Sequence, residues 1–90
     1  MDISFDSDKN VSNIGKHGVP LTLASRIDWS EVLSCPDDRK DYGELREIGF
    51  AVIDDRLYVV VFVQRDEMMR VISLRKANAR EVQMYDQANQ

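Results

Sequence analysis

Apolar positions in the second half of the chain alternate or run continuously, and this pattern predicts a β-sheet. Residues 57–64, "LYVVVFVQ", are nearly all apolar and β-branched, which is typical of a central strand covered on both faces. The stretches 45–53 and 68–74 flank it, with short polar turns at 54–56 and 65–67. Turns this short join neighbouring antiparallel strands, so the pattern predicts a three-stranded meander.

The start of the chain predicts a short edge strand followed by a helix. The stretch "ISF" (3–5) can form the strand. A helix is predicted over 8–17, where either Asp6 or Ser7 can cap the first turn. Gly18 follows directly, as glycine does at many helix C-termini.

A second helix is predicted from Pro20, because proline suits the first helical turn, where its missing N–H is not needed. Three apolar residues then share one helical face at fourfold spacing: Val19, Leu23 and Ile27. The stretch 34–43, "SCPDDRKDYG", is polar and rich in turn formers, so it is predicted to be a loop. Gly49, inside the next predicted strand, marks a bulge or the close approach of another segment.

The end of the chain predicts a final helix. Asn78 and Glu81 have the spacing of a capping box, and Val82 and Tyr85 are expected to point inward. Together the elements predict an α+β fold with two N-terminal helices, an antiparallel sheet of about four strands and a C-terminal helix, the helices lying on one side of the sheet. The 90 residues are expected to form one domain, 1–90.

Composition narrows the kinds of site that the chain can form. The single cysteine, Cys35, excludes an intramolecular disulfide and favours a reducing cytoplasm. One histidine and one cysteine fall short of the four ligands of a usual zinc site, so no metal or cofactor is predicted. No apolar run has the length of a membrane span, and the acidic N-terminus is unlike a signal peptide.

The charge is negative in sum but unevenly distributed. The net charge of -4 and the pI of about 4.8 are unusual for a general nucleic-acid binder. Residues 28–47 carry seven acids and three bases, whereas residues 65–80 carry five bases and two acids. The second cluster is compatible with a local anion-binding site.

Three separated stretches resemble, in order, the sequence patterns of one protein family. They are "FDSDKNVSNIGKHGV" at 5–19, "YGELREIGF" at 42–50 and "RVISLRKANAREVQMY" at 70–85. The family is BrnT, bacterial type II toxins that are small ribonucleases with a RelE-like fold. The resemblance implies a metal-independent endoribonuclease that cleaves mRNA and inhibits translation. It also implies a BrnA-like antitoxin with a ribbon-helix-helix domain, through which alone the complex would contact operator DNA.

Cleaving RNA without a metal requires a base for the 2′-hydroxyl proton, an acid for the leaving oxygen and cations for the phosphate. Carried onto this chain, the resemblance assigns the catalytic roles to Lys16, His17, Arg46, Arg70 and Arg75. Either Lys16 or His17 would transfer protons, and the arginines would hold the scissile phosphate through their planar forks. Further substrate contacts are assigned to Lys9, Ser73, Lys76 and Arg80, and orienting roles to Glu44 and Tyr85.

Regular strand geometry would separate two of the assigned arginines. Arg70 and Arg75 have opposite parity, so in a regular strand their side chains face opposite sides of the sheet. They can share a site only if the strand ends near Leu74 and lets Arg75 turn at the entrance to the last helix. Ser73 has the same parity as Arg75 and is therefore expected on its face.

Each candidate also has a simpler structural interpretation. Lys16 and His17 stabilise the C-terminal end of a helix in any protein, and Arg46 can pair with a carboxylate across strands. For the whole chain, the acidic charge favours an alternative function, a catalytically inactive co-repressor that binds the antitoxin. An unrelated α+β interaction domain is the third hypothesis.

Overall fold

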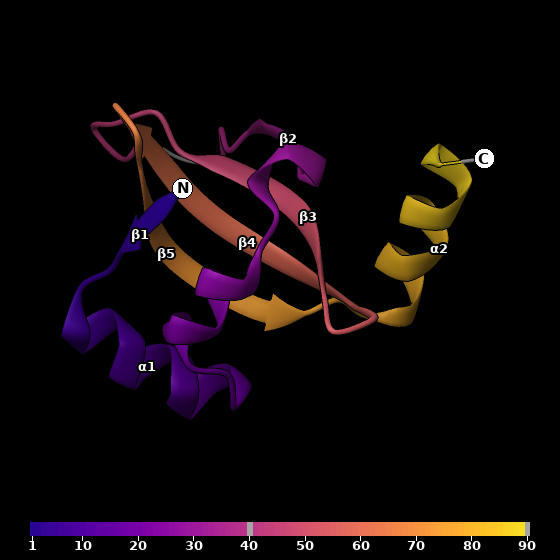
Figure 1. Ribbon diagram of the computed structural model, residues 1–90, viewed down its shortest axis with the longest axis horizontal. Helices are drawn as coiled ribbons and strands as arrows, with labels where there is room; N and C mark the ends of the chain where they lie inside the picture. The colour runs from indigo at the N-terminus through magenta and orange to yellow at the C-terminus, as the bar shows by residue number, and fades with distance from the viewer. Residues whose placement is uncertain (40, 90) are drawn as a thin grey trace.

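The computed structural model describes residues 1–39 and 41–89, which contain a five-stranded mixed sheet (Figure 1). The strands are β1 (Asp2–Ser4), β2 (Leu33–Pro36), β3 (Glu47–Ile53), β4 (Arg56–Arg65) and β5 (Met68–Lys76). Their order across the sheet is β1-β5-β4-β3-β2; β1 runs parallel to β5, and the other neighbours are antiparallel. The fold is therefore α+β as predicted, but the prediction of about four antiparallel strands is wrong.

The inner strands β3, β4 and β5 form the predicted meander, and the outer strands account for the difference. β1 is the predicted edge strand, but no hairpin links it to β5, so nothing requires the antiparallel direction. β2 occupies part of the stretch predicted as a loop, of which residue 40 lies outside the described residues. All four β2 side chains are exposed, so the strand has no apolar alternation and is held by pairing with β3.

The first helix, α1 (Ser7–His17), begins and ends where the sequence predicts. The Asp6 carboxylate accepts hydrogen bonds from the backbone N–H groups of Asp8 and Lys9, at 2.8 and 3.4 Å. Gly18 ends the helix at φ +68°, in the left-handed region.

The predicted second helix is instead two short 3-10 helices, η1 (Leu21–Arg26) and η2 (Trp29–Glu31). The residues buried in this region, Leu21, Ala24 and Ile27, recur every third position. That is the period of a 3-10 helix, and it overrides the fourfold spacing of Val19, Leu23 and Ile27.

The main core lies between η1 and one face of the sheet. Leu21 and Ala24 of η1 pack in one cluster with Val60 of β4 and Leu74 of β5, and all four are fully buried. Burying one leucine or valine side chain contributes about 1.5–3 kcal/mol. Trp29 meets the ring of Phe62 edge-on, with centroids 4.9 Å apart.

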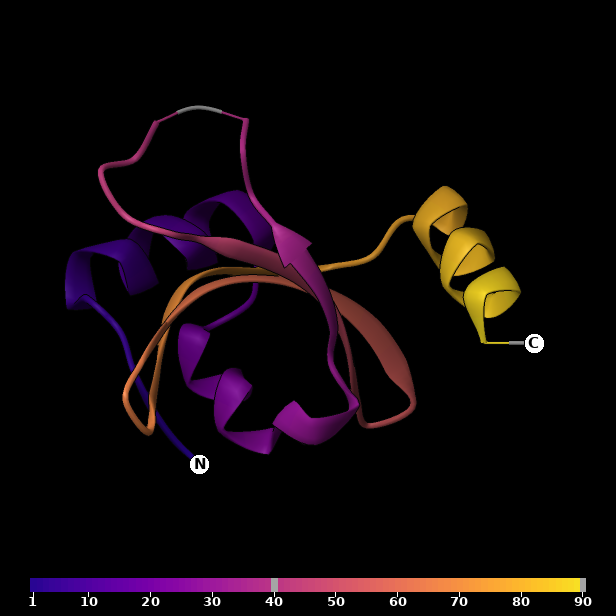
Figure 2. The ribbon, with the colours of Figure 1, turned by 90° about the horizontal axis from the view of Figure 1, so that it is seen from above.

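The last helix, α2 (Ala79–Ala88), lies on the other side of the sheet from η1 and η2 (Figure 2). Its capping box is present as predicted, between Asn78 and Glu81. Val82 is exposed rather than turned inward, and Tyr85 makes an edge-on contact with Phe50 at 5.9 Å. The prediction of helices on one side only is wrong, because η1 and η2 already cover the core face.

Gly49 of β3 marks a close approach, as predicted. A Cβ atom placed there would lie 2.8 Å from Cγ1 of Val32, 3.1 Å from Cβ of Ser34 and 3.2 Å from the carbonyl oxygen of Leu33. The absence of a side chain therefore lets β2 lie flat beside β3.

Gly49→Ala is expected to destabilise the fold by about 1–3 kcal/mol, because β2 must shift to admit the methyl group. The free energy of unfolding in urea measures the effect. Gly15→Ala is the matched control: it lies inside α1 with no atom within 4 Å of the new Cβ, and it should stabilise the protein by about 0.5–1 kcal/mol. Equal effects of the two substitutions would contradict the close-approach interpretation.

Candidate functional site

One irregularity in β5 determines which side chains share the open face of the sheet, the face turned away from η1. The cross-strand pairs there are Val63–Arg70, Val61–Ser73 and Val59–Arg75. The register shifts by one residue between the first and second of these pairs, so Ile72 is the extra residue of a β-bulge. The bulge reverses the alternation, and Arg70, Ser73 and Arg75 therefore lie on the same face.

This outcome corrects the geometric argument from the sequence. Arg70 and Arg75 share a face although β5 does not end near Leu74; the strand continues to Lys76. The expectation that β5 must end near Leu74 assumed a strand with regular alternation of side chains, and the bulge breaks that alternation. Ser73 lies on the face of Arg75, as its parity predicts.

Glu44 lies at the centre of three arginines on this face. Its carboxylate accepts hydrogen bonds from Arg46 at 3.3 Å and from Arg65 at 3.1 Å, and it lies 3.9 Å from a guanidinium nitrogen of Arg70. Burial raises the pKa of Glu44, but hydrogen bonds from Arg46 and Arg65 outweigh it and hold the pKa below its ordinary value. The guanidinium group of Arg46 also stacks over the Tyr42 ring, 4.1 Å from its centroid. Glu44 is thus positioned to orient these arginines.

Arg75 is held by a carboxylate from α2. Its Nη1 and Nη2 donate to the two Glu81 oxygens at 2.7 and 2.8 Å, the bidentate geometry that arginine favours. Glu81 also accepts a 2.9 Å hydrogen bond from the backbone N–H of Asn78. The Arg75 hydrogen bonds lower the pKa of Glu81, and Glu81 in turn raises the pKa of Arg75.

A small hollow of about 200 Å³ lies between α1 and β5. Four of the predicted site residues line it together: Lys9, Lys16, His17 and Ser73. Ser73 also lies between Arg70 and Arg75 along β5, so the hollow adjoins the row of arginines. The α1 residues and the strand residues therefore meet at Ser73.

Asn13 fixes α1 against β5. Its side-chain nitrogen donates to the carbonyl oxygens of Val19 and Leu74, both at 2.7 Å, and its oxygen accepts from the backbone N–H of Leu74 at 3.1 Å. β1 pairs with β5 only as far as Arg70, so the Asn13 amide satisfies a strand edge that β1 does not reach.

Three predicted residues lie away from this face. Lys76 stands opposite Tyr58, whose side chain belongs to the main core, and so it points to the other side of the sheet. Arg80 is exposed in the first turn of α2. Tyr85 packs on Phe50 in a separate groove beside α2. The placement of Lys76 and Arg80 does not match the shared substrate site expected from their closeness in sequence.

Two arginines of this region, Arg65 and Arg39, were not predicted as site residues from the sequence. Arg65 has the parity of Val63 on β4, a signal that places it on the arginine face. Arg39 binds Asp37 through two hydrogen bonds of 2.7 and 2.8 Å, and its charge is close enough to Arg75 to oppose slightly the rise that Glu81 causes in the pKa of Arg75. Arg39 lies within the stretch 34–43 predicted to be a loop, which gives no sequence signal of its position.

The fold and this face together define a small α+β protein with a mixed sheet whose open side is cationic. The family model described as "Ribonuclease toxin, BrnT, of type II toxin-antitoxin system" matches residues 5–81. The chain belongs to this BrnT family of ribonuclease toxins, and type II membership implies an antitoxin partner.

A solved structure is similar to this chain across its fold. It is the crystal structure of the Brucella abortus ribonuclease toxin BrnT, with a TM-score of 0.68 and 23% sequence identity. The match covers 87% of this chain and 97% of that chain. A search of curated proteins gave no match. Within residues 1–39 and 41–89, no helix is long and apolar enough to cross a membrane, and no group of three metal-ligating acids, histidines or cysteines occurs.

Asn13→Ala is expected to destabilise the protein by at least about 2 kcal/mol, because it leaves buried backbone groups of Leu74 and Val19 without partners. Urea denaturation measures the loss, and amide hydrogen exchange at Leu74 should become faster. Ser12→Ala, at the exposed residue directly before Asn13, is the control and should change stability by less than about 0.5 kcal/mol. A Leu74 amide that stays equally protected would show that Asn13 does not hold this edge.

The Arg75–Glu81 pair predicts a dependence of stability on acid pH. The pKa of Glu81 is lower in the folded protein than its ordinary 4.5, so the pair's contribution is fully present above that value and is lost as pH falls through the lower folded pKa. Glu81→Gln should lower the free energy of unfolding at about pH 7 and reduce its decline towards about pH 3, while glutamine still permits the capping box.

The measurement is urea denaturation across that pH range. Glu67→Gln, in the exposed turn between β4 and β5, is the matched control and should follow the wild-type curve. A wild-type decline that survives Glu81→Gln unchanged would contradict the assignment.

Proposed function

We propose that this chain is a metal-independent endoribonuclease that cleaves mRNA and so inhibits translation. The observation that carries the proposal is the β-bulge at Ile72, which puts Arg70, Ser73 and Arg75 on one face beside the hollow that holds His17. Cations for the phosphate and side chains that can transfer protons are the two requirements of RNA cleavage without a metal. A RelE-like active site built on a sheet face is consistent with this arrangement.

The reaction is a transesterification within the RNA. His17 or Lys16 takes the proton of a 2′-hydroxyl, and the 2′-oxygen then attacks the adjacent phosphorus. The bond from phosphorus to the 5′-oxygen breaks, the other of the two residues protonates that oxygen, and a 2′,3′-cyclic phosphate remains. Arg46, Arg70 and Arg75 neutralise the charge that develops on the phosphate oxygens. Lys9 and Ser73 contact the neighbouring sugar and phosphate.

Local electrostatics supports phosphate binding despite the acidic chain. Five arginines and three carboxylates meet on or beside this face: Arg39, Arg46, Arg65, Arg70, Arg75, Asp37, Glu44 and Glu81. The surplus of cations contrasts with the net charge of -4 for the whole chain. Such a face attracts an anionic substrate to one side of the molecule.

A BrnA-like ribbon-helix-helix antitoxin is the proposed partner, and any contact with operator DNA belongs to it. One observation favours a second function, an inactive co-repressor that only binds the antitoxin. Glu81 occupies both Nη atoms of Arg75, and Glu44 engages Arg46 and Arg65, so the arginines of the face already have carboxylate partners.

Substitutions on the face should separate these functions. The purified chain is expected to cleave single-stranded RNA at a rate that a chelator does not change, and Arg70→Ala or His17→Ala should lower that rate about a hundredfold. Arg56→Ala, at the far end of β4, is the control and should retain the wild-type rate. A gel of end-labelled RNA gives the rates.

Full cleavage by both variants would show that other residues do the chemistry. A folded wild-type chain that cleaves no RNA, yet binds the antitoxin, would favour the co-repressor.

A further inference from the structure

We propose that the groove between α2 and the sheet is the docking site for a segment of the antitoxin that combines apolar side chains with carboxylates. The proposal rests on the proposed function in one respect, that the neighbouring arginines bind RNA. Seated there, the segment blocks RNA by covering those arginines, so that the antitoxin neutralises the toxin by direct competition.

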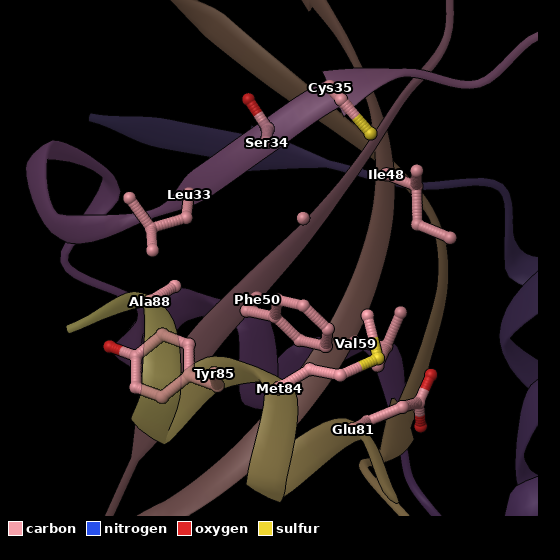
Figure 3. A pocket seen from close by; sticks show the side chains of 11 residues that line it. Leu33, Ser34, Cys35, Ile48, Phe50, Val59, Glu81, Met84, Tyr85 and Ala88 are labelled. Carbon is pink, nitrogen blue, oxygen red and sulfur yellow. The ribbon is translucent and has the colours of Figure 1, made fainter. Parts of the chain in front are cut away.

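The groove has the size and chemistry of a site for protein side chains. Its volume is about 430 Å³, and its walls come from β2, β3, β4 and α2 (Figure 3). Most of the lining is apolar: Leu33, Ile48, Phe50, Val59, Met84 and Tyr85. Such walls offer little to a sugar–phosphate chain and suit aliphatic or aromatic side chains, with methionine able to adapt to their shapes.

α2 is incompletely packed without a partner. No residue of this helix from Ala79 to Ala88 is buried. Its side chains reach the sheet through the ring contact of Tyr85 with Phe50 and the ion pair of Glu81 with Arg75. Met84 is 54% exposed and Leu33, across the groove, is 45% exposed. Large apolar side chains exposed on both walls of one groove are typical of an interaction surface.

The charges beside the groove indicate which polar groups the bound segment carries. The groove is bounded at one end by Glu81, whose partner Arg75 begins the arginine face. The side chains of Arg39 and Arg65 are 64% and 59% exposed, so they are accessible to carboxylates from outside. A segment that leaves the groove at this end therefore meets cations, and acidic residues there give charge complementarity.

The same charges disfavour a second copy of this chain as the occupant. A two-fold dimer through the groove would bring the arginine faces of both copies close together, because each face adjoins its groove at Arg75. Like charges placed opposite each other at an interface are unfavourable. RNA bases stack on aromatic rings but leave the aliphatic walls of this groove uncovered. An amphipathic acidic protein segment therefore fits both parts of the surface better.

The test places a charge in the groove and leaves the arginines intact. Leu33→Glu and Met84→Glu, on opposite walls, should each weaken binding of the purified product of the adjacent reading frame at least about tenfold, measured by calorimetry. Both variants should still cleave RNA at the wild-type rate, and the antitoxin should no longer inhibit them fully. Val11→Glu, on α1 and 70% exposed, is the matched control and should bind as the wild type does.

Circular dichroism checks the fold of each variant, and Met84→Ser is a milder substitute if Met84→Glu unfolds. Wild-type affinity in both folded groove variants would overturn the proposal. So would loss of RNA cleavage in these variants, which would make the groove part of the RNA site, or a wild-type dimer that Leu33→Glu converts to a monomer. Failure of the proposed function would look different from failure of this proposal. The wild-type chain would then cleave no RNA, while calorimetry would still show whether the groove variants lose affinity for the antitoxin.

Discussion

The hydrogen bonds between the Asn13 side chain and the backbone of Leu74 are the constraint on which the proposed site depends. The amide uses both its donor and its acceptor on one residue of β5, as a neighbouring strand would. α1 is therefore held at one height along the strand, whereas apolar packing alone permits sliding. At that height the last turn of α1, with Lys16 and His17, lies beside Ser73. The same amide binds Val19 and so fixes the chain as it leaves the helix.

The bulge at Ile72 is the second constraint, and the sequence contains no sign of it. A bulge changes the face of every later residue in its strand, and parity then fails as a guide from that point on. In "RVISL" there is no glycine, and Ser73 fits the regular alternation with Val71 and Arg75, so nothing in this stretch marks Ile72 as an extra residue. The register with β4 alone shows that Ser73, two residues after Val71, stands opposite Val61. Regular alternation would place Arg70 and Arg75 on opposite faces of the sheet, and the bulge brings them onto the same face.

The parts of the fold that depend on residues close together in the chain could be predicted from the sequence. The caps of α1 and α2, the three inner strands and the close approach at Gly49 follow from residues near each other in sequence. β2 and the side of the sheet that α2 occupies depend on long-range contacts, so no local pattern specifies them. For the site, the hollow with Lys9, Lys16 and His17 was predictable from the family motif. Lys76 lies away from the arginine face because side chains alternate again after the bulge. Arg80 lies away from it because of the direction in which α2 leaves the strand.

The ion pairs of the arginine face bear on how one surface could serve both of the proposed anionic ligands. Unpaired, these guanidinium groups would repel one another; Glu44 and Glu81 hold them in fixed orientations at little cost, because the pairs remain partly exposed. Glu81 uses one N–H of each Nη of Arg75, so a phosphate must displace Glu81 or bind the remaining N–H donors of the guanidinium group. Glu81 belongs to α2, and α2 is also a wall of the apolar groove. A segment that moves α2 on entering the groove would therefore move Glu81 relative to Arg75, which would couple occupancy of the groove to the strength of the proposed phosphate site.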